Sequence, residues 1–203
     1  MRRLAALVFP GFEQLDLYGP LEMFGLLGER VALTLVAETP GPVASGGGPR
    51  SLAEAGLDDA GPYDLVLVPG GPGTRREVDN PALAAWIARQ AETAEVLASV
   101  CTGAALLARA GVLDGRRATT NKRAWAWATA QGPGVAWQPK ARWVQDGRLW
   151  TSSGVAAGID MALALIGALY GTPLAEEVAA HAEYDWHRDP DWDPFAARYG
   201  LTG

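Results

Sequence analysis

Four short apolar runs, each bounded by turn-forming or polar residues, constrain the fold of this chain most strongly. They span residues 4–9, 31–37, 65–68 and 96–100. Runs that are apolar at every position, rather than at alternate ones, are typical of strands buried on both faces of a parallel sheet. Most segments between and after them are expected to form helices. The expected helices span residues 17–27, 81–93, 102–110, 122–130, 155–170 and 173–183. This alternation predicts an α/β fold.

Two further segments predict small β-hairpins beside that sheet. Residues 39–51 are rich in glycine and proline, and residues 141–153 alternate around Asp146-Gly147, a strong hairpin signal. Trp143 and Trp150 are expected to face each other across the second hairpin. We expect a flavodoxin-like three-layer sandwich with a mostly parallel sheet, in which the four apolar strands follow the order 2-1-3-4.

Composition excludes several classes of protein. The chain has 203 residues, and its one cysteine cannot form an internal disulfide. A formal net charge of −6 argues against nucleic-acid binding through phosphate contacts. The first apolar run stops at Pro10, too early for a signal peptide, and Asp160 interrupts the apolar stretch 154–171, which favours a core helix over a membrane span. We therefore expect a cytoplasmic protein without a nucleic-acid or membrane partner.

No internal repeat or linker divides the chain. We expect a single domain over residues 1–203, with a tryptophan-rich C-terminal tail over residues 183–203. The tail contains His187 among alternating aspartates, but its prolines break the geometry of a calcium loop, so we predict a solvated loop and no metal site. His181 and His187 are not expected to be catalytic.

Candidate functional residues follow three of the predicted strands. Ligands of open parallel sheets bind beyond the carboxyl ends of the strands. In the expected order, the segments FPGFEQLD, VPGGPGT and SVCTGA end at the same edge. Asp16, the Gly70-Gly71 backbone and Cys101 are therefore expected to lie together.

Cys101 is predicted to be a nucleophile on a tight strand-to-helix turn. Ser99 and Gly103 flank it at a spacing of two, and small residues at these positions are what a nucleophile elbow requires. N–H groups at the start of the following helix favour the thiolate, so a thiol pKa below about 8.5 is expected. The alternative is that Cys101 is a small buried hydrophobic residue.

The other two segments offer groups that assist a nucleophile. Gly70 and Gly71 have no side chains, so their N–H groups are predicted to form an oxyanion hole, although a turn after a strand would explain them too. Asp16 is the acid placed to exchange a proton with a bound molecule. An N-cap role for Asp16 is also open, since aspartate is favoured there.

Four segments together resemble the ThiJ/PfpI superfamily, whose fold is that of the class I glutamine amidotransferases. They are LDLYGPLEMF, VLVPGGPGT, SVCTGAALLARAGVLDGRRATT and SSGVAAGIDMALALI. The acid before Leu-Tyr-Gly-Pro, and Cys-Thr-Gly in place of Cys-His-Gly, are most similar to the isonitrile hydratase branch. The resemblance implies a nucleophilic Cys101, a general acid/base Asp16, a supporting Thr102 and a homodimer. Asn121 stands where hydratases often have a histidine, which places it in the substrate pocket.

This resemblance predicts a cysteine-dependent enzyme that hydrates an isonitrile to an N-substituted formamide without metal or organic cofactor. One alternative is a glyoxalase- or deglycase-like activity on reactive carbonyls, which needs the same thiol and acid. Another is a non-enzymatic oxidation sensor in which Cys101 becomes a sulfinic acid. A ligand-sensing module of a transcription regulator is disfavoured, because the sequence ends at Gly203 without room for a DNA-binding helix pair.

Overall fold

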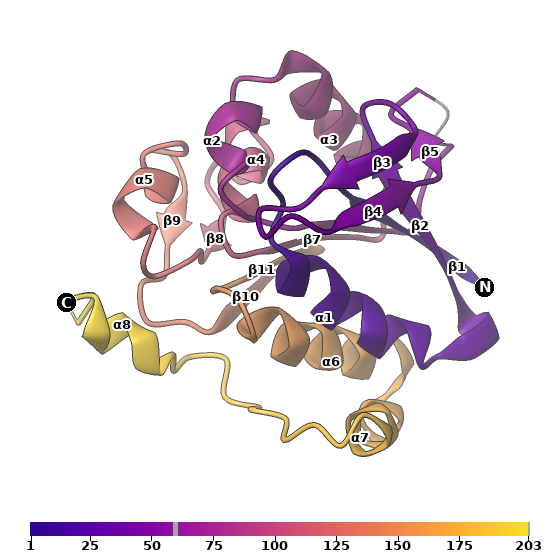
Figure 1. The fold of residues 1–203 in the computed structure, drawn as a ribbon. Helices are drawn as coiled ribbons and strands as arrows, with labels where there is room; N and C mark the ends of the chain where they lie inside the picture. Colours follow the sequence, from indigo (N-terminus) through magenta and orange to yellow (C-terminus); the bar gives the residue numbers. More distant parts are fainter. Residues whose placement is uncertain (59–60, 203) are drawn as a thin grey trace.

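A seven-stranded sheet forms the centre of the computed structural model, which describes residues 1–58 and 61–202 (Figure 1). Its order is β10-β11-β7-β6-β1-β2-β5. The strands are β1 (Arg2–Leu7), β2 (Val31–Ala37), β5 (Ala55–Gly56), β6 (Leu65–Val68), β7 (Val96–Val100), β10 (Trp143–Asp146) and β11 (Leu149–Ser152). All neighbouring pairs are parallel except β10 and β11. The order β2-β1-β6-β7 confirms the predicted 2-1-3-4 arrangement.

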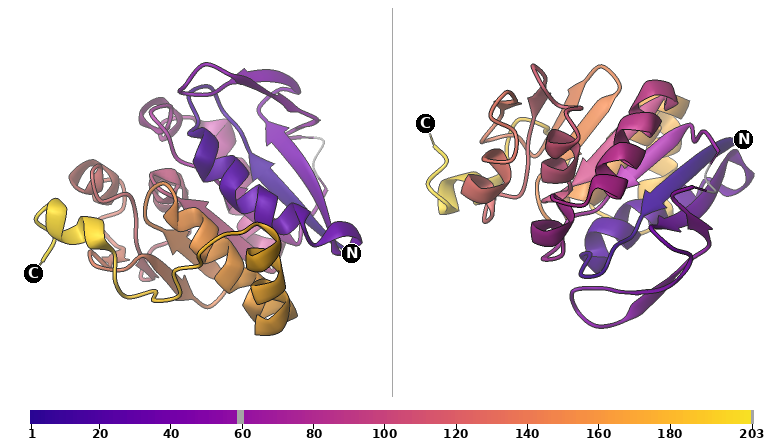
Figure 2. Two further views of the ribbon diagram at one scale, coloured as in Figure 1. Left: turned by 60° about the horizontal axis from the view of Figure 1, so that its bottom comes forward. Right: turned by 90° about the horizontal axis from the view of Figure 1, so that it is seen from above.

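Helices cover both faces of the sheet and complete a three-layer sandwich (Figures 1 and 2). On one face α1 packs against α6, and α7 packs on α6; on the other, α4 lies against the sheet with α2 and α3 beside it. The helices are α1 (Gln14–Gly25), α2 (Thr74–Glu77), α3 (Pro81–Thr93), α4 (Gly103–Arg109), α5 (Trp125–Thr129), α6 (Ala157–Tyr170), α7 (Thr172–His181) and α8 (Pro194–Arg198), with a short 3-10 helix at Gly28–Arg30. Each predicted helix is present, and α2 and α8 are additional.

The predicted hairpin over residues 39–51 is confirmed, because β3 (Gly41–Ala44) pairs antiparallel with β4 (Arg50–Ala53) in a separate two-stranded sheet. The second hairpin differs from expectation. Its strand β11 joins β7 in parallel, so the hairpin extends the central sheet. A further small sheet pairs β8 (Arg117–Ala118) with β9 (Ala136–Trp137).

The predicted pairing of two tryptophans across the second hairpin is wrong. Trp143 lies opposite Ser152, and Trp150 lies opposite Gln145. The last paired residues are Asp146 and Leu149, so the turn falls on residues 147–148, one position later than Asp146-Gly147. This shift of the turn moves the two tryptophans to diagonal positions on one face.

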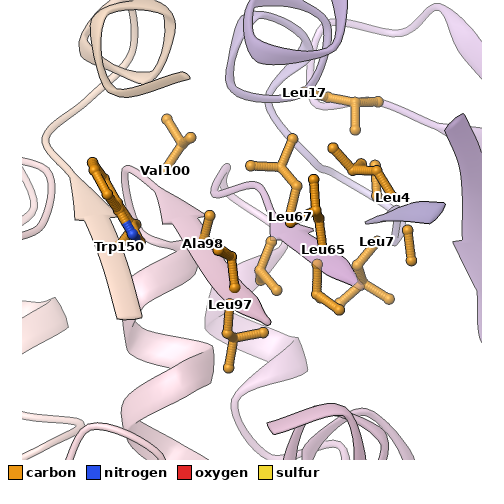
Figure 3. Packing of buried hydrophobic residues seen from close by; sticks show 14 of the residues in the cluster. Leu4, Leu7, Leu17, Leu65, Leu67, Leu97, Ala98, Val100 and Trp150 are labelled. Atoms are coloured by element: carbon orange, nitrogen blue, oxygen red, sulfur yellow. The ribbon is translucent and has the colours of Figure 1, made fainter. Parts of the chain in front are cut away.

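The core explains why the central strands are almost entirely apolar. Every residue of β6 and β7 is buried. Figure 3 shows Leu65 and Leu67 of β6 beside Leu97 and Ala98 of β7, with Leu17 of α1 closing one side. Helices on both faces exclude water from these strands, as continuous apolar runs require. The carboxyl ends of β1, β6 and β7 are therefore held in fixed positions.

The C-terminal tail is anchored to the edge of the sheet. The Arg142 N–H donates to the Pro190 carbonyl (2.7 Å), and the Asp193 N–H donates to the Lys140 carbonyl (2.9 Å). Asp193 is buried and caps α8 through the Phe195 N–H (2.9 Å). The expectation of a solvated loop is therefore wrong at Asp193, whereas Asp185, Asp189 and Asp191 are exposed. The tail brings α8 near α5 (Figures 1 and 2).

The sequence also predicted a single domain and no membrane-spanning helix. The division into a single domain stays a prediction. None of the helices built from residues 1–58 and 61–202 has the length and apolar character needed to cross a membrane. The stretch 154–171 instead forms α6, whose Asp160 is fully buried.

Candidate functional site

A cleft of about 930 Å³ opens at the carboxyl ends of the central strands, with Cys101 in its lining. Its walls come from the start of α1, the segments that follow β6, β7 and β11, the segment before α5, and α8. The lining residues are Glu13, Leu15, Gly46, Gly47, Gly71, Pro72, Arg75, Cys101, Thr102, Asn121, Lys122, Arg123, Ala124, Arg142, Ser153, Gly154, Val155, Ala156, Phe195 and Tyr199. The predicted ligand site at this edge of the sheet is therefore a real concavity.

Cys101 occupies a strained turn between β7 and α4. Its φ is +58°, a left-handed conformation that is uncommon for a residue with a side chain. The backbone holds this turn in place: the Cys101 N–H donates to the Ser152 carbonyl (3.1 Å), and the Thr120 hydroxyl donates to the Cys101 carbonyl (2.9 Å). A Cβ at Gly103 would collide with the Val68 carbonyl oxygen. The elbow geometry predicted from the flanking small residues is present.

Asp16 lies in the first turn of α1 and is fully buried. The residue at the N-cap position is Glu13, so the N-cap interpretation of Asp16 is wrong. Its Oδ2 instead accepts the N–H of Gly70, which lies in the loop after β6 (2.9 Å). No N–H or O–H donor within the described ranges hydrogen bonds to Oδ1, which is also buried.

Burial determines the protonation of the Asp16–Cys101 pair. Burial raises the pKa of Asp16 to about 8, and the hydrogen bonds from Gly70 and Cys101 offset only part of that rise. Burial, and the adjacent Asp16 carboxylate, also raise the pKa of the Cys101 thiol, while the Thr102 N–H and the Asn121 amide oppose the rise. The predicted thiol pKa below the ordinary value is therefore wrong, because desolvation outweighs the helix-start donors. At neutral pH Asp16 holds its proton.

Gly70 and Gly71 do not offer free oxyanion donors in this structure. The Gly70 N–H is bonded to Asp16 Oδ2 (2.9 Å), and the Gly71 N–H is bonded to Thr102 Oγ1 (3.0 Å). The predicted oxyanion hole is therefore wrong for this arrangement. Glycine is nevertheless required, since a Cβ at Gly70 would lie 2.9 Å from Asp16 Oδ2 and 2.6 Å from Thr102 Oγ1. Both glycines let the loop after β6 approach the elbow closely.

Thr102 supports this loop through its hydroxyl group. Besides the Gly71 N–H, its Oγ1 has a hydrogen bond with Thr74 Oγ1 (3.1 Å), and the Thr74 hydroxyl donates to the Gly71 carbonyl (2.7 Å). Both threonines are buried. The supporting position expected for Thr102 is therefore present, and Thr74 is a second support that the sequence did not reveal, because nothing local distinguishes a threonine that begins α2.

Asn121 contacts the sulfur directly. Its Nδ2 donates to Cys101 Sγ (3.1 Å), and its Oδ1 accepts the Ala124 N–H (2.8 Å). The second bond fixes the orientation of the amide, so that the NH₂ group and not the oxygen faces the sulfur. Sequence reasoning assigned Asn121 to the substrate pocket; the structure places it in the cleft and against the predicted nucleophile.

Two further residues of the cleft lining, Gly154 and Lys122, had no signal in the sequence. A Cβ at Gly154 would lie 3.2 Å from Cys101 Sγ and would overlap the Asn121 amide, so only glycine fits beside the elbow. Lys122 is buried, and burial lowers the pKa of its ammonium group to about 8. Its Nζ donates to Thr119 Oγ1 and to the Ala141 carbonyl, both at 2.7 Å.

The remaining candidates lie away from the cleft lining. His181 ends α7, and His187 packs against Trp192 in the tail with ring centroids 5.5 Å apart. Within residues 1–58 and 61–202, no group of three or more histidine, cysteine or acidic side chains is arranged to hold a metal ion. Of the aromatic tail residues, Phe195 and Tyr199 line the cleft, whereas Trp186 and Trp192 do not.

Comparisons with known proteins agree with this geometry. The model of the DJ-1/PfpI family matches residues 2–168. An isonitrile hydratase from Pseudomonas putida is 36% identical over 182 residues, which cover 90% of this chain and 78% of that protein. The transcriptional regulator GbdR from Pseudomonas aeruginosa is 35% identical over 65% of this chain, a stretch that covers 35% of the regulator.

A solved structure has the same architecture. A ThiJ/PfpI family protein from Pseudomonas syringae superposes with a TM-score of 0.82 at 29% sequence identity, covering 98% of this chain and 84% of that one. The family match spans β1 to most of α6, and therefore includes the strands, the elbow and the cleft described above. The α/β fold, the cysteine elbow and these matches together show that the chain belongs to the DJ-1/PfpI family.

Proposed function

We propose that this protein hydrates an isonitrile to an N-substituted formamide, with Cys101 as the nucleophile and Asp16 as the proton donor. The observation that carries this proposal is a buried carboxyl group, protonated up to a pH of about 8, in contact with a thiol on an elbow. Addition to an isonitrile places both a nucleophile and a proton on the same carbon. In this site the nucleophile Cys101 and the proton donor Asp16 lie next to each other.

The first step forms a covalent adduct. The Cys101 sulfur bonds to the terminal carbon of the isonitrile, and that carbon receives the proton of Asp16, which gives a thioimidate. The thiol proton passes to Asp16, so the carboxyl group ends the step protonated. Oδ1 is the oxygen suited to this exchange, since Oδ2 is engaged by the Gly70 N–H. The raised pKa of Asp16 lies near the operating pH, as efficient general acid catalysis requires.

The second step consumes water and restores the enzyme. Water adds to the thioimidate carbon, a proton moves to nitrogen, and the carbon–sulfur bond breaks to release the formamide and the Cys101 thiol. Asp16 again carries the protons. Asn121 Nδ2 stabilises negative charge on the departing sulfur, because it already donates to Sγ at 3.1 Å. Overall, one isonitrile and one water give one formamide.

The similarity to an isonitrile hydratase over 90% of the chain supports this proposal. The rival oxidation-sensor function is disfavoured by a specific observation: Cys101 is only 5% exposed and its thiol pKa is raised, whereas sensor cysteines are accessible and acidic. A glyoxalase- or deglycase-like activity requires the same two groups. Turnover of a reactive carbonyl instead of an isonitrile would select it.

The experiment compares two substrate classes on one enzyme. Purified protein is given a small neutral alkyl isonitrile or methylglyoxal, and formamide release or aldehyde consumption is measured. Cys101→Ala is the control, and it should show no turnover above the uncatalysed rate. We expect steady formamide release from the isonitrile. Consumption of methylglyoxal with no formamide from any isonitrile would overturn the proposal in favour of the carbonyl activity.

We also propose that the protein is a homodimer, as the family resemblance implies. Trp192, Phe195 and Tyr199 leave apolar surface exposed near α8, and such surface is often covered by a partner. Light scattering is the test, and a mass twice that of the 21.4 kDa chain is expected. A constant mass of one chain across concentrations would refute it.

A further inference from the structure

The cleft that contains Cys101 has an unusual balance of charge. Four cationic side chains line it, and Glu13 is the one acidic residue in the lining. The chain as a whole has a net charge of −6, so cationic residues are in the minority elsewhere. The cationic residues are Arg75, Lys122, Arg123 and Arg142.

One of these cations is already neutralised. Arg142 is buried and donates to Asp160 Oδ2 through Nε (2.8 Å) and a terminal nitrogen (2.6 Å). The other three differ from it. Within the described part of the chain, no carboxylate lies within 4.0 Å of Arg75, Lys122 or Arg123. Arg75 and Arg123 therefore face the cleft without a counterion among the described residues, whereas the charge of Lys122 is stabilised by the buried Asp193 carboxylate.

Arg75 is held in place despite its exposure. Its guanidinium carbon lies 4.2 Å from the centroid of the Trp127 ring, the geometry of a cation–π contact. Stacking fixes the plane of the guanidinium and leaves its edge N–H groups free to bind an anion. Arg75 is therefore a preorganised donor on the wall of the cleft.

Lys122 is the third cation, and the acid that stabilises its charge is Asp193 of the C-terminal tail. It is buried, and both oxygens that accept from its Nζ belong to neutral groups, Thr119 and Ala141. Its Nζ also lies 5.1 Å from the Trp125 ring centroid. An ammonium group has three N–H donors, so one remains without an oxygen partner within the described residues. Burial still lowers the pKa of Lys122 to about 8 despite Asp193, so a bound anion in the cleft would further stabilise its charged form.

We propose that the cleft selects substrates with an anionic group, a carboxylate in the first instance, separated by a short spacer from the carbon that Cys101 attacks. Lys122 and Arg123 directly follow Asn121, which touches the sulfur, so the spacer is short. Arg75 stacks on Trp127 of α5, the helix that follows Arg123, and binds the anion from that position. For turnover this rests on the proposed function, and the substrate class is then an isonitrile carboxylate. Recognition of the anion itself is independent of the reaction.

The first test needs no turnover. Cys101 is the single cysteine, so its alkylation is read from intact mass with iodoacetate, an anion, and with iodoacetamide, its neutral analogue. In each case a sulfur–carbon bond forms and iodide leaves. The reacting thiolate and the carboxylates of glutathione repel the iodoacetate anion, so glutathione should react faster with iodoacetamide. In this protein we expect the ratio of the iodoacetate rate to the iodoacetamide rate to exceed that of glutathione. A ratio equal to or below that of glutathione would overturn the proposal.

Variants then locate the effect. Arg75→Gln and Arg123→Gln should each lower the iodoacetate rate about fivefold, the size expected for a partly exposed ion pair, and leave the iodoacetamide rate unchanged. Arg30→Gln is the matched control: it removes the same charge from the short helix before β2, away from the cleft lining, and should change neither rate. Equal loss in Arg30→Gln would show a general field effect and reject a local site.

The second test joins recognition to turnover. Isocyanoacetate and its neutral methyl ester carry the same isonitrile group, and their kcat/KM values are compared. The anion should be preferred, and the preference should disappear in an Arg75→Gln/Arg123→Gln variant. Equal values for acid and ester would overturn the substrate class and leave the hydratase proposal standing. Absence of turnover for both, with the iodoacetate preference retained, would reject the hydratase proposal and keep the anion site.

Discussion

Asp16 and Asp160 are both fully buried, and both lie in the first turn of a helix, α1 and α6. Their partners differ completely. Asp160 Oδ2 pairs with the Arg142 guanidinium, and its Oδ1 accepts the Tyr184 hydroxyl (3.1 Å) and the His187 N–H (2.9 Å). Among the described residues, Asp16 has no cationic partner, and its one nitrogen or oxygen donor is the Gly70 N–H.

The difference in partners gives Asp160 a structural role and leaves Asp16 available for proton transfer. Four donors, two of them from the Arg142 guanidinium, satisfy the Asp160 carboxylate, so it ties the C-terminal tail to α6 and to the residue before β10. Asp16 lacks such compensation, and burial therefore raises its pKa to about 8. A buried acid that remains protonated beside a thiol can give up a proton during a reaction. The same residue type at the same helical position thus serves two purposes, according to its partners.

The largest expected effect is on the pH dependence of stability. The pKa of Asp16 is about 8 in the folded protein and near 4 in the unfolded chain, so the folded state binds the extra proton between these values. Its contribution to stability is fully present below pH 4 and is lost as pH rises through 8, by up to several kcal/mol. Urea unfolding of wild type and Asp16→Asn at pH 4 to 9 measures it. Parallel curves for the two proteins would show that Asp16 titrates normally.

Breaking the Asp160 cluster should produce a loss of stability instead. Asp160→Asn leaves Arg142 buried without its counterion, and removal of one partner of a buried pair typically costs about 3–5 kcal/mol. We expect a lower midpoint of urea unfolding at pH 7, with the tail more readily proteolysed. Retention of the wild-type midpoint would mean that the ion pair does not hold the tail. Asp189→Asn, an exposed acid in the same tail, is the matched control.

Asp16→Asn should separate activity from stability. Asparagine retains the shape and an oxygen for the Gly70 N–H but has no acidic proton, so turnover of an isonitrile should fall about 100- to 10,000-fold. Thermal unfolding at pH 7 should show no loss of stability, since an unpaired buried acid is replaced by a neutral amide. Loss of folding together with activity would assign Asp16 a structural role like that of Asp160.

The smallest effect is expected at Asn121. Asn121→Ala removes the amide that donates to Cys101 Sγ and leaves the Ala124 N–H without its acceptor. Loss of one hydrogen bond of ordinary strength, about 1 kcal/mol, predicts roughly fivefold slower turnover and a further rise of the thiol pKa. Alkylation of Cys101 by iodoacetamide as a function of pH reports that pKa. An unchanged profile would show that the amide does not stabilise the thiolate.

Sequence patterns predicted the sheet well because burial on both faces leaves a direct signature. The bounds of β2, β6, β7 and α3 match those expected, and the carboxyl edge brings Asp16, Gly70 and Cys101 together as the strand order implies. The sequence-based predictions were wrong where contacts between distant segments determine a pKa or a hydrogen-bond partner. The thiol pKa depends on desolvation and on Asp16, and the Gly70 and Gly71 N–H groups are engaged by side chains from other elements.

Other features were hidden because they arise only when distant segments meet. In the sequence Lys122 has no feature that distinguishes it from other charged residues, but in the structure it is buried and donates to Thr119 and Ala141. Gly154 has no local mark either, and its requirement for glycine comes from the sulfur and the Asn121 amide. The tail was predicted as a solvated loop, because its anchor to Asp160 joins residues 24 and 27 positions apart.

Protonation of Asp16 at neutral pH can be observed directly at its carboxyl group. The ¹³C chemical shift of the Asp16 side-chain carboxyl is followed from pH 3 to 10 in protein labelled at aspartate, with Asp16→Asn used to assign the signal. We expect a titration midpoint near 8 for the Asp16 carboxyl group. A midpoint near 4 would show a charged Asp16 at neutral pH and would contradict its role as the proton donor.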